Sequence, residues 1–219
     1  MKSGVLKIIC IFFISLIATG VFLTNIKVDC VEYFQRKNDV PFGEITQNHG
    51  MLQEIRLIND VNISKIDILM ATYNRANNCN VNFELYRNGE KVYHYQLKDA
   101  STLIDNSYYT LNNVNVDYKI GDELYLSITS EAENGNAVTV WMNSKSQDRK
   151  AFVYDGVNDT KELSKGTAMI KVYAKESAME FLNKNFCYCN NYVVCILLGP
   201  LLTFIILVFK QLLPEKCDF

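Results

Sequence analysis

Residues 83–93 read FELYRNGEKVY and carry the strongest local signal for a β-hairpin in this 219-residue chain. Apolar and polar residues alternate on both sides of Asn88-Gly89, as expected of strands with one buried face. The Asn-Gly pair favours the positive φ angles that a two-residue primed turn requires. The segment therefore predicts two antiparallel strands joined at Asn88 and Gly89.

The same alternation continues on both sides of this hairpin. Asn, Gly and Asp clusters separate the alternating runs, and no helical pattern is interleaved with them, which argues against a parallel α/β sheet. Short antiparallel strands in this number predict an all-β fold, an antiparallel β-sandwich or jelly roll. The predicted strands cover residues 43–48, 51–58, 64–72, 80–87, 91–98, 107–116, 123–130, 137–143, 151–153 and 166–173.

Two apolar runs without a charged residue, 8–24 and 192–209, flank the strand-forming region. A helix needs about 20 apolar residues to cross the hydrocarbon core. We therefore expect transmembrane helices over about 5–25 and 190–210. Two alternatives remain open: the first run fits a cleaved signal peptide, and the second a buried core helix.

The domain organisation follows from these runs. Residues 1–41 are expected to form an anchor and stalk, residues 42–174 the extracytoplasmic β-sandwich, and residues 175–219 a stalk, the second transmembrane helix and a short cytoplasmic tail. Threefold apolar spacing predicts short stalk helices over 28–37 and 174–185. Because Lys2 and Lys7 precede the first run, we expect both termini in the cytoplasm and the central domain outside the cell membrane.

Three cysteines lie next to the predicted membrane segments. Cys30 follows the first run, and Cys187 and Cys189 precede the second. A disulfide between Cys30 and one of the other two is geometrically feasible if the ends of the domain meet, and isolated thiols are the alternative. A Cys-x-Cys pair without a nearby histidine does not make a structural zinc site, so we expect no metal and no cofactor.

Composition and motifs exclude several classes of function. The net charge of −2 and the absence of a long Lys/Arg block argue against a nucleic-acid partner. His49 and His94 are the only histidines, and neither belongs to a catalytic motif. We therefore expect a protein that is not an enzyme.

Two segments carry groups suited to ligand binding. Tyr73, Asn74 and Arg75 combine an aromatic ring, an amide and a guanidinium, which suit the apolar faces and the hydroxyls of sugars. The alternative is a loop whose asparagines satisfy their own backbone. Trp141 with Asn143 forms the second candidate, beside Arg149 and Tyr154, if the indole faces outward rather than into the core.

The segments IDILMATYNR (66–75), VNFELYRNG (81–89), IDN (104–106), GDELYLSITS (121–130) and VTVW (138–141) resemble, in this order, galactose-binding-like jelly rolls. Such domains occur in extracytoplasmic parts of bacterial membrane proteins linked to surface polysaccharides. The resemblance implies a carbohydrate-related role for Tyr73, Arg75 and Trp141.

The expected function is therefore that of a membrane-anchored domain that binds or guides carbohydrate at the cell surface, accessory to polysaccharide assembly or export. Its expected partners are a cell-envelope glycan, the lipid bilayer and a polytopic membrane protein. The alternative is a non-enzymatic structural subunit of a membrane protein complex.

Overall fold

The computed structural model describes residues 2–35, 37, 40–146, 151–155, 160–163, 166–185 and 199, with the side chains of 2–12, 154, 155, 160–163, 183 and 185 outside the description. The chain divides into two compact units. One is Val31–Ala174, and the other combines Met1–Cys30 with Lys175–Phe219.

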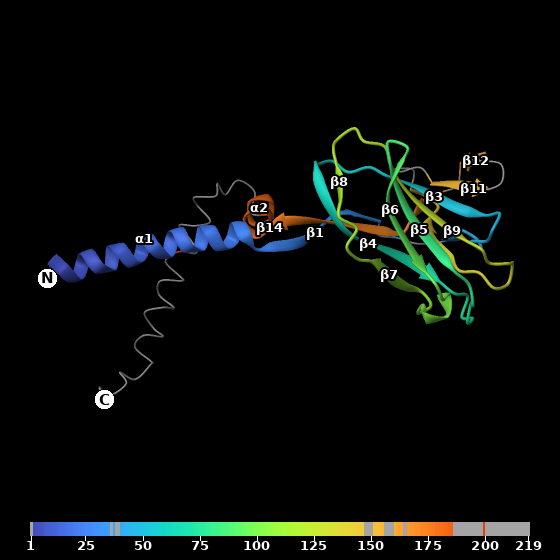
Figure 1. Ribbon diagram of the computed structural model, residues 1–219, viewed down its shortest axis with the longest axis horizontal. Coiled ribbons are helices and arrows are strands. Elements are labelled where there is room, and N and C mark those ends of the chain that lie inside the picture. Colours follow the sequence, from blue (N-terminus) through green and yellow to red (C-terminus); the bar gives the residue numbers. More distant parts are fainter. Residues whose placement is uncertain are drawn as a thin grey trace, which may run out of the picture. The chain divides into compact units, whose positions relative to one another are not determined.

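Two antiparallel sheets make up most of the described structure (Figure 1). The first has eight strands, and the order of its main path is β1, β14, β4, β10 and β13. Strand β2 pairs with β10, and β7 and β8 pair with β4. The strands of this sheet are β1 (Lys27–Phe34), β2 (Val40–Pro41), β4 (Val61–Ala71), β7 (Ser107–Leu111), β8 (Val116–Tyr118), β10 (Thr139–Asn143), β13 (Thr167–Ala168) and β14 (Ile170–Ser177).

The second sheet has six strands in the order β12, β11, β3, β9, β5 and β6. A short 3₁₀ helix, η1 (Ala100–Thr102), lies between β6 and β7 in the chain. The predicted all-β, antiparallel fold is confirmed. The strands of this sheet are β3 (Gly50–Ile55), β5 (Val81–Arg87), β6 (Glu90–Leu97), β9 (Leu124–Ser130), β11 (Ala151–Asp155) and β12 (Thr160–Leu163).

The core draws apolar side chains from both sheets. Ile66, Ile68 and Met70 of β4 are almost fully buried, as are Phe83 of β5 and Ile128 of β9. They belong to one continuous cluster of buried residues. Since apolar burial is the main favourable term in folding, the alternation seen in the sequence specifies which face of each strand points into this cluster.

The hairpin formed by β5 and β6 has the predicted turn. Asn88 and Gly89 both have positive φ angles, 53° and 84°. Arg87 and Glu90 are paired on either side of them. This geometry is why Asn and Gly occupy the two positions.

The predicted stalk helix over 28–37 is wrong. Residues Lys27–Phe34 form strand β1, with Cys30 buried between exposed Asp29 and exposed Val31. The segment is rich in β-branched and aromatic residues, and hydrogen bonding to the neighbouring strand β14 stabilises it as an edge strand. A threefold spacing of only three apolar residues does not distinguish a helix from a strand.

The second stalk helix begins later than predicted. Strand β14 continues to Ser177, and helix α2 covers Ala178–Asn185. The Ser177 hydroxyl accepts from the Glu180 backbone N–H at 3.2 Å, and the Glu180 carboxylate accepts from the Ser177 backbone N–H at 2.8 Å. This reciprocal pair is a capping box, and it fixes the first turn of α2.

Other predicted elements differ at their ends. Residues 43–48 are not a strand, although Ile45 donates its backbone N–H to Val138 and Thr46 forms an isolated bridge with His49. Strands β2 and β12 were not predicted. Both are short, with two and four residues, so they give little alternation to detect.

Helix α1 covers Lys2–Asn25 and contains the first apolar run. In the part of the chain that is described, no helix meets the combined criteria of length and apolarity for a membrane span. The two predicted spans therefore remain predictions. The second lies outside the described residues except for Gly199.

Candidate functional site

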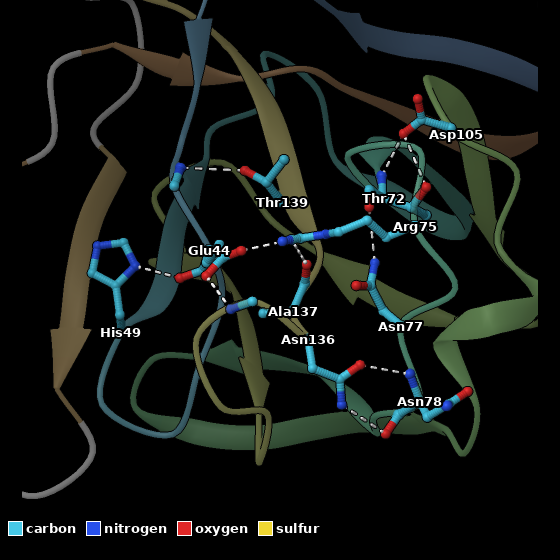
Figure 2. A network of polar contacts seen from close by, with 12 residues as sticks. Glu44, His49, Thr72, Arg75, Asn77, Asn78, Asp105, Asn136, Ala137 and Thr139 are labelled. Atoms are coloured by element: carbon cyan, nitrogen blue, oxygen red, sulfur yellow. Dashed lines mark hydrogen bonds and ion pairs between the residues drawn. The ribbon is translucent and has the colours of Figure 1, made fainter.

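The predicted binding residues 73–75 lie in the loop that follows β4, and Figure 2 shows the polar contacts that hold this loop. The segment before β3 and the segment before β10 contribute Glu44 and Ala137 to the same network. We call the loop residues 72–80, together with the segment 131–137, the loop site. Its parts are far apart in the sequence and are joined by side-chain hydrogen bonds.

Asp105 fixes the start of the loop site. Its Oδ1 accepts from the Thr72 backbone N–H at 2.5 Å and from the Thr72 hydroxyl at 3.1 Å. The backbone hydrogen bond is the main reason why the pKa of Asp105 is lowered. These bonds hold the turn in which Tyr73 and Asn74 both have φ angles of 57°.

Arg75 links three segments of the loop site. Its Nη2 lies 2.6 Å from Glu44 Oε1 and donates to the Ala137 carbonyl at 3.2 Å. Its guanidinium also lies 4.9 Å from the centroid of the Tyr73 ring. The hydrogen bond from Arg75 is the main cause that lowers the pKa of Glu44, whose Oε2 accepts from the Gly135 backbone N–H at 2.8 Å.

Tyr73 is the exposed aromatic ring of the loop site, and a ligand could stack on it. It is 40% exposed. Among the described residues its hydroxyl has no hydrogen-bond partner. Because Arg75 supports one side of the ring, the ring is held in place without being covered. The neighbouring Asn74 is exposed as well.

A pocket of about 300 Å³ lies between residues 78–80 and 131–136 of the loop site. Asn78 and Asn136 bond reciprocally, with Asn136 Oδ1 accepting from the Asn78 backbone N–H at 2.8 Å and its Nδ2 donating to the Asn78 carbonyl at 3.2 Å (Figure 2). This pair fixes one wall. The polar lining consists of four asparagines and two glutamates: Asn78, Asn80, Asn134, Asn136, Glu131 and Glu133.

Asn77 and Cys79 are buried residues of the loop. Asn77 is fully buried and donates from Nδ2 to the Thr72 carbonyl at 3.0 Å, whereas its Oδ1 has no partner among the described residues. Burial raises the pKa of the Cys79 thiol. The loop asparagines therefore satisfy the backbone in part, as the alternative interpretation expected, while Asn78 and Asn80 line a pocket.

Trp141 faces outward, which settles the question left open by the sequence. It is half-buried and alternates with the buried Val140 and Met142. Its Nε1 donates to Asn106 Oδ1 at 2.8 Å, and Asn106 Nδ2 donates to Asp105 Oδ2 at 2.8 Å. The indole is thus connected through these two residues to the loop site.

The remaining predicted site residues have no described contact with the loop site. Asn143 lies on the same face as Trp141, but its Oδ1 accepts from the Lys145 backbone N–H at 3.0 Å and closes a local turn. Tyr154 belongs to β11 in the other sheet, and its side chain is outside the description. Arg149 lies outside the described residues, as do Cys187 and Cys189, so the disulfide with the buried Cys30 remains a prediction.

Three aromatic or cationic residues in the same sheet as Trp141 were not predicted as site residues. Tyr108 of β7, Phe34 of β1 and Lys171 of β14 lie on the outer face of the eight-stranded sheet. The signal was present in the pattern, since Tyr108 and Lys171 alternate with inward-facing residues. The sequence alone does not show that these three strands lie in the same sheet.

Among the described residues, no group of three or more histidine, cysteine, aspartate or glutamate side chains is arranged to hold a metal ion. Asp105, the acidic residue closest to the loop site turn, uses both of its oxygens in hydrogen bonds to Thr72 and Asn106.

No family model matches the chain, and no curated protein does. One solved structure that matches is the crystal structure of the CBM36-1 domain of a multidomain xylanase from the hindgut metagenome of Trinervitermes trinervoides. The identity is 12%, the match covers 67% of this chain and 94% of that chain, and the TM-score is 0.31. At this TM-score the likeness carries no argument about this protein.

Proposed function

We propose that this protein is a membrane-anchored β-sandwich that binds carbohydrate at the extracytoplasmic surface of the cell membrane. The observation that carries the proposal is the exposed Tyr73 ring, backed by Arg75, in a loop whose later residues line a pocket of asparagines and glutamates. Sugars present apolar C–H faces and many hydroxyls, and this combination of ring, amide and carboxylate groups complements both.

The loop site is preorganised for this purpose. Asp105 holds the turn that presents Tyr73, the Glu44 and Arg75 pair holds the loop against neighbouring segments, and Asn136 is already fixed on Asn78. A ligand that binds there orders few additional groups. Preorganisation of this kind increases affinity because less conformational entropy is lost on binding.

Helix α1 supports the membrane part of the proposal. Its 24 residues correspond to about 36 Å of helix. Exposed apolar side chains follow one side of it, and their exposed fractions range from 57% to 65%. Such a surface is unfavourable in water and favourable in lipid. The residues are Phe13, Ile14, Ile17, Val21 and Phe22.

The other side of α1 carries small and hydroxyl-bearing residues. Ser15 and Thr19 are buried there, and the Ser15 hydroxyl donates to the Gly199 carbonyl at 3.1 Å. A Cβ atom on Gly199 would lie 3.4 Å from Leu16 Cα, so the two segments approach closely. Close approach through small residues is how transmembrane helices pack, which supports the proposal that both apolar runs cross the membrane side by side.

We infer from this arrangement a binding protein that serves polysaccharide assembly or export without catalysing a reaction, with both termini in the cytoplasm. The positive charges of Lys2 and Lys7 before the first run support this orientation.

The direct test is a glycan array probed with the full-length protein in a neutral detergent. Binding to one or more cell-envelope glycans, lost in the Tyr73→Ala variant and retained in Tyr73→Phe, is the expected result. Absence of binding to any glycan on the array would overturn the proposal.

A structural subunit of a membrane complex is the second candidate, and the exposed apolar side of α1 favours it because a partner helix could cover that surface in place of lipid. Purification in mild detergent distinguishes the two. A subunit is expected to retain a stoichiometric membrane partner, whereas a self-sufficient glycan-binding protein is not.

A further inference from the structure

The outer face of the eight-stranded sheet is unusually aromatic for a surface that no second layer of the described residues covers. Antiparallel sheets normally present polar residues on their open face. Here Tyr108 and Phe34 are 36% and 41% exposed, and Trp141 and Leu69 are half-buried on the same face. Exposed apolar surface of this kind commonly marks a binding site.

Strand register places these residues together. Leu69 of β4 is paired with Tyr108 of β7, and Asp67 is paired with Lys171 of β14. Residues opposite each other in an antiparallel pair project from the same face. The alternating residues Ile66, Ile68 and Met70 project into the core, so Asp67 and Leu69 must project outward.

Lys171 is the cation of this face that lies against Tyr108, whereas Lys65 lies against Tyr173. Its Nζ lies 3.8 Å from the centroid of the Tyr108 ring and 5.0 Å from that of Phe34. The two rings hold the ammonium group in place while leaving its charge uncompensated. Within the described part of the chain, Lys171 belongs to no ion pair.

Asp67 is the nearest acidic residue by register, and its two oxygens are already used. Oδ1 accepts from the Thr110 hydroxyl at 2.7 Å, and Oδ2 accepts from the Tyr173 hydroxyl at 2.8 Å. Asp67 is buried, at 9% exposure, whereas Lys171 is half-buried. An anion that approaches this face is therefore closer to the accessible ammonium group of Lys171 than to the buried carboxylate of Asp67.

We propose that this outer face is a second subsite of the carbohydrate site and that Lys171 binds the carboxylate of an acidic sugar residue, a hexuronate. The subsite rests on the proposed carbohydrate-binding function and names its ligand class. The sugar ring lies against Tyr108 and Trp141 while its carboxylate contacts the lysine ammonium. An acidic polysaccharide is thus the favoured ligand over a neutral one.

The two subsites are linked by hydrogen bonds. Trp141 is joined to the loop site by its hydrogen bond to Asn106, which in turn bonds Asp105. The cationic Lys171 held between aromatic rings complements an acidic sugar, which is why a glycan, rather than a protein segment, is the assigned occupant.

The test uses an array of uronic-acid oligosaccharides, each printed beside its carboxyl-reduced neutral counterpart. The array is probed with the full-length protein in neutral detergent. The wild-type protein is expected to bind the acidic member about tenfold more tightly, with a preference that falls as NaCl is added. The Lys171→Met variant, which keeps the apolar stem, is expected to bind both members equally. The matched control Lys98→Met, an exposed lysine that follows strand β6 of the other sheet, is expected to keep the preference.

The outcomes separate the inference from the proposed function. Binding of both members without a preference, or a preference that persists in Lys171→Met, overturns the acidic subsite and leaves carbohydrate binding intact. Binding of neither member overturns both. Loss of all binding in Lys171→Met with an unchanged melting temperature also contradicts the inference, because the loop site should still hold the neutral member.

Discussion

Arg75 Nη2 and Glu44 Oε1 lie 2.6 Å apart, and this ion pair joins two segments of the chain that are 31 positions apart. The side chains are 36% and 25% exposed, so solvent screens the attraction. The pair therefore serves mainly to position the loop, because Arg75 also contacts the Tyr73 ring and donates to the Ala137 carbonyl.

The first prediction concerns this pair. Arg75→Met is expected to lower the free energy of unfolding by about 1 kcal/mol, because it removes a partly exposed ion pair and one hydrogen bond. The change is measured by denaturant unfolding followed by the fluorescence of the single tryptophan. The matched control is Arg56→Met, whose partner Glu54 is only two residues away, and it should change stability by less than about 0.5 kcal/mol. Equal effects of the two substitutions would contradict the role assigned to Arg75.

Acid stability provides the second prediction. Hydrogen bonds lower the pKa of Asp105 and of Glu44 in the folded protein. Both carboxylates therefore stabilise the fold above their ordinary pKa values of about 4, and this stabilisation is lost as the pH falls through the lowered folded values. The unfolding free energy of the wild type should decrease as the pH falls from about 5 to 2.

Asp105→Asn removes one of these titrating groups. The variant is expected to be less stable at pH 7 by about 1 kcal/mol and to lose less stability on acidification. Unfolding titrations at several pH values give both quantities. If the unfolding free energy of the variant depends on pH as strongly as that of the wild type, the hydrogen bonds from Thr72 do not lower the pKa of Asp105 enough to stabilise the fold.

Gly166 gives the third prediction. Its φ is +121°, and a Cβ atom there would lie 2.4 Å from the Asn143 carbonyl oxygen. Gly166→Ala is expected to cost about 2 to 4 kcal/mol, since backbone atoms must move in addition to the strain of the positive φ. Gly121→Ala is the control, because its φ is +100° with no atom within 4 Å of the added Cβ, and it should cost only about 1 kcal/mol. Similar melting temperatures for the two variants would show that the added Cβ at position 166 does not clash with the Asn143 carbonyl oxygen.

The fourth prediction concerns location. Glu90 is exposed beside the β5 to β6 turn, so Glu90→Cys should be modified by a membrane-impermeant maleimide in intact cells. The wild type serves as the background for the native cysteines, of which Cys79 is buried. Labelling of the introduced cysteine only after permeabilisation would reverse the proposed orientation.

Much of the sandwich could be predicted from the sequence because burial on one face leaves a period of two in each strand. The hairpin at Asn88 and Gly89 was the clearest instance, since both the strands and the turn have local chemical causes. Strand β1 was mistaken for a helix because its stability comes from pairing with β14, nearly 150 positions later, which no local pattern records.

The candidate site was predictable only in part for the same reason. Tyr73, Asn74 and Arg75 are consecutive, so their combination of side chains is visible in the sequence. Long-range contacts supply the rest: Glu44 reaches Arg75, Asn136 reaches Asn78, and Lys171 reaches Tyr108. The outward direction of Trp141 likewise depends on the position of β10 in its sheet.

In the proposed complex a sugar stacks on the ring of Tyr73, and a binding titration tests this stacking. A cell-envelope glycan selected from the array is titrated into the full-length wild type, Tyr73→Phe, Tyr73→Ala and the control Ile104→Ala, which removes a 75% exposed apolar side chain from a neighbouring loop. Tyr73→Ala is expected to weaken binding about tenfold, whereas the other two variants should bind like the wild type, and all four proteins should share a melting temperature. Wild-type affinity in Tyr73→Ala, or the absence of measurable binding by the wild type, would contradict the proposed stacking.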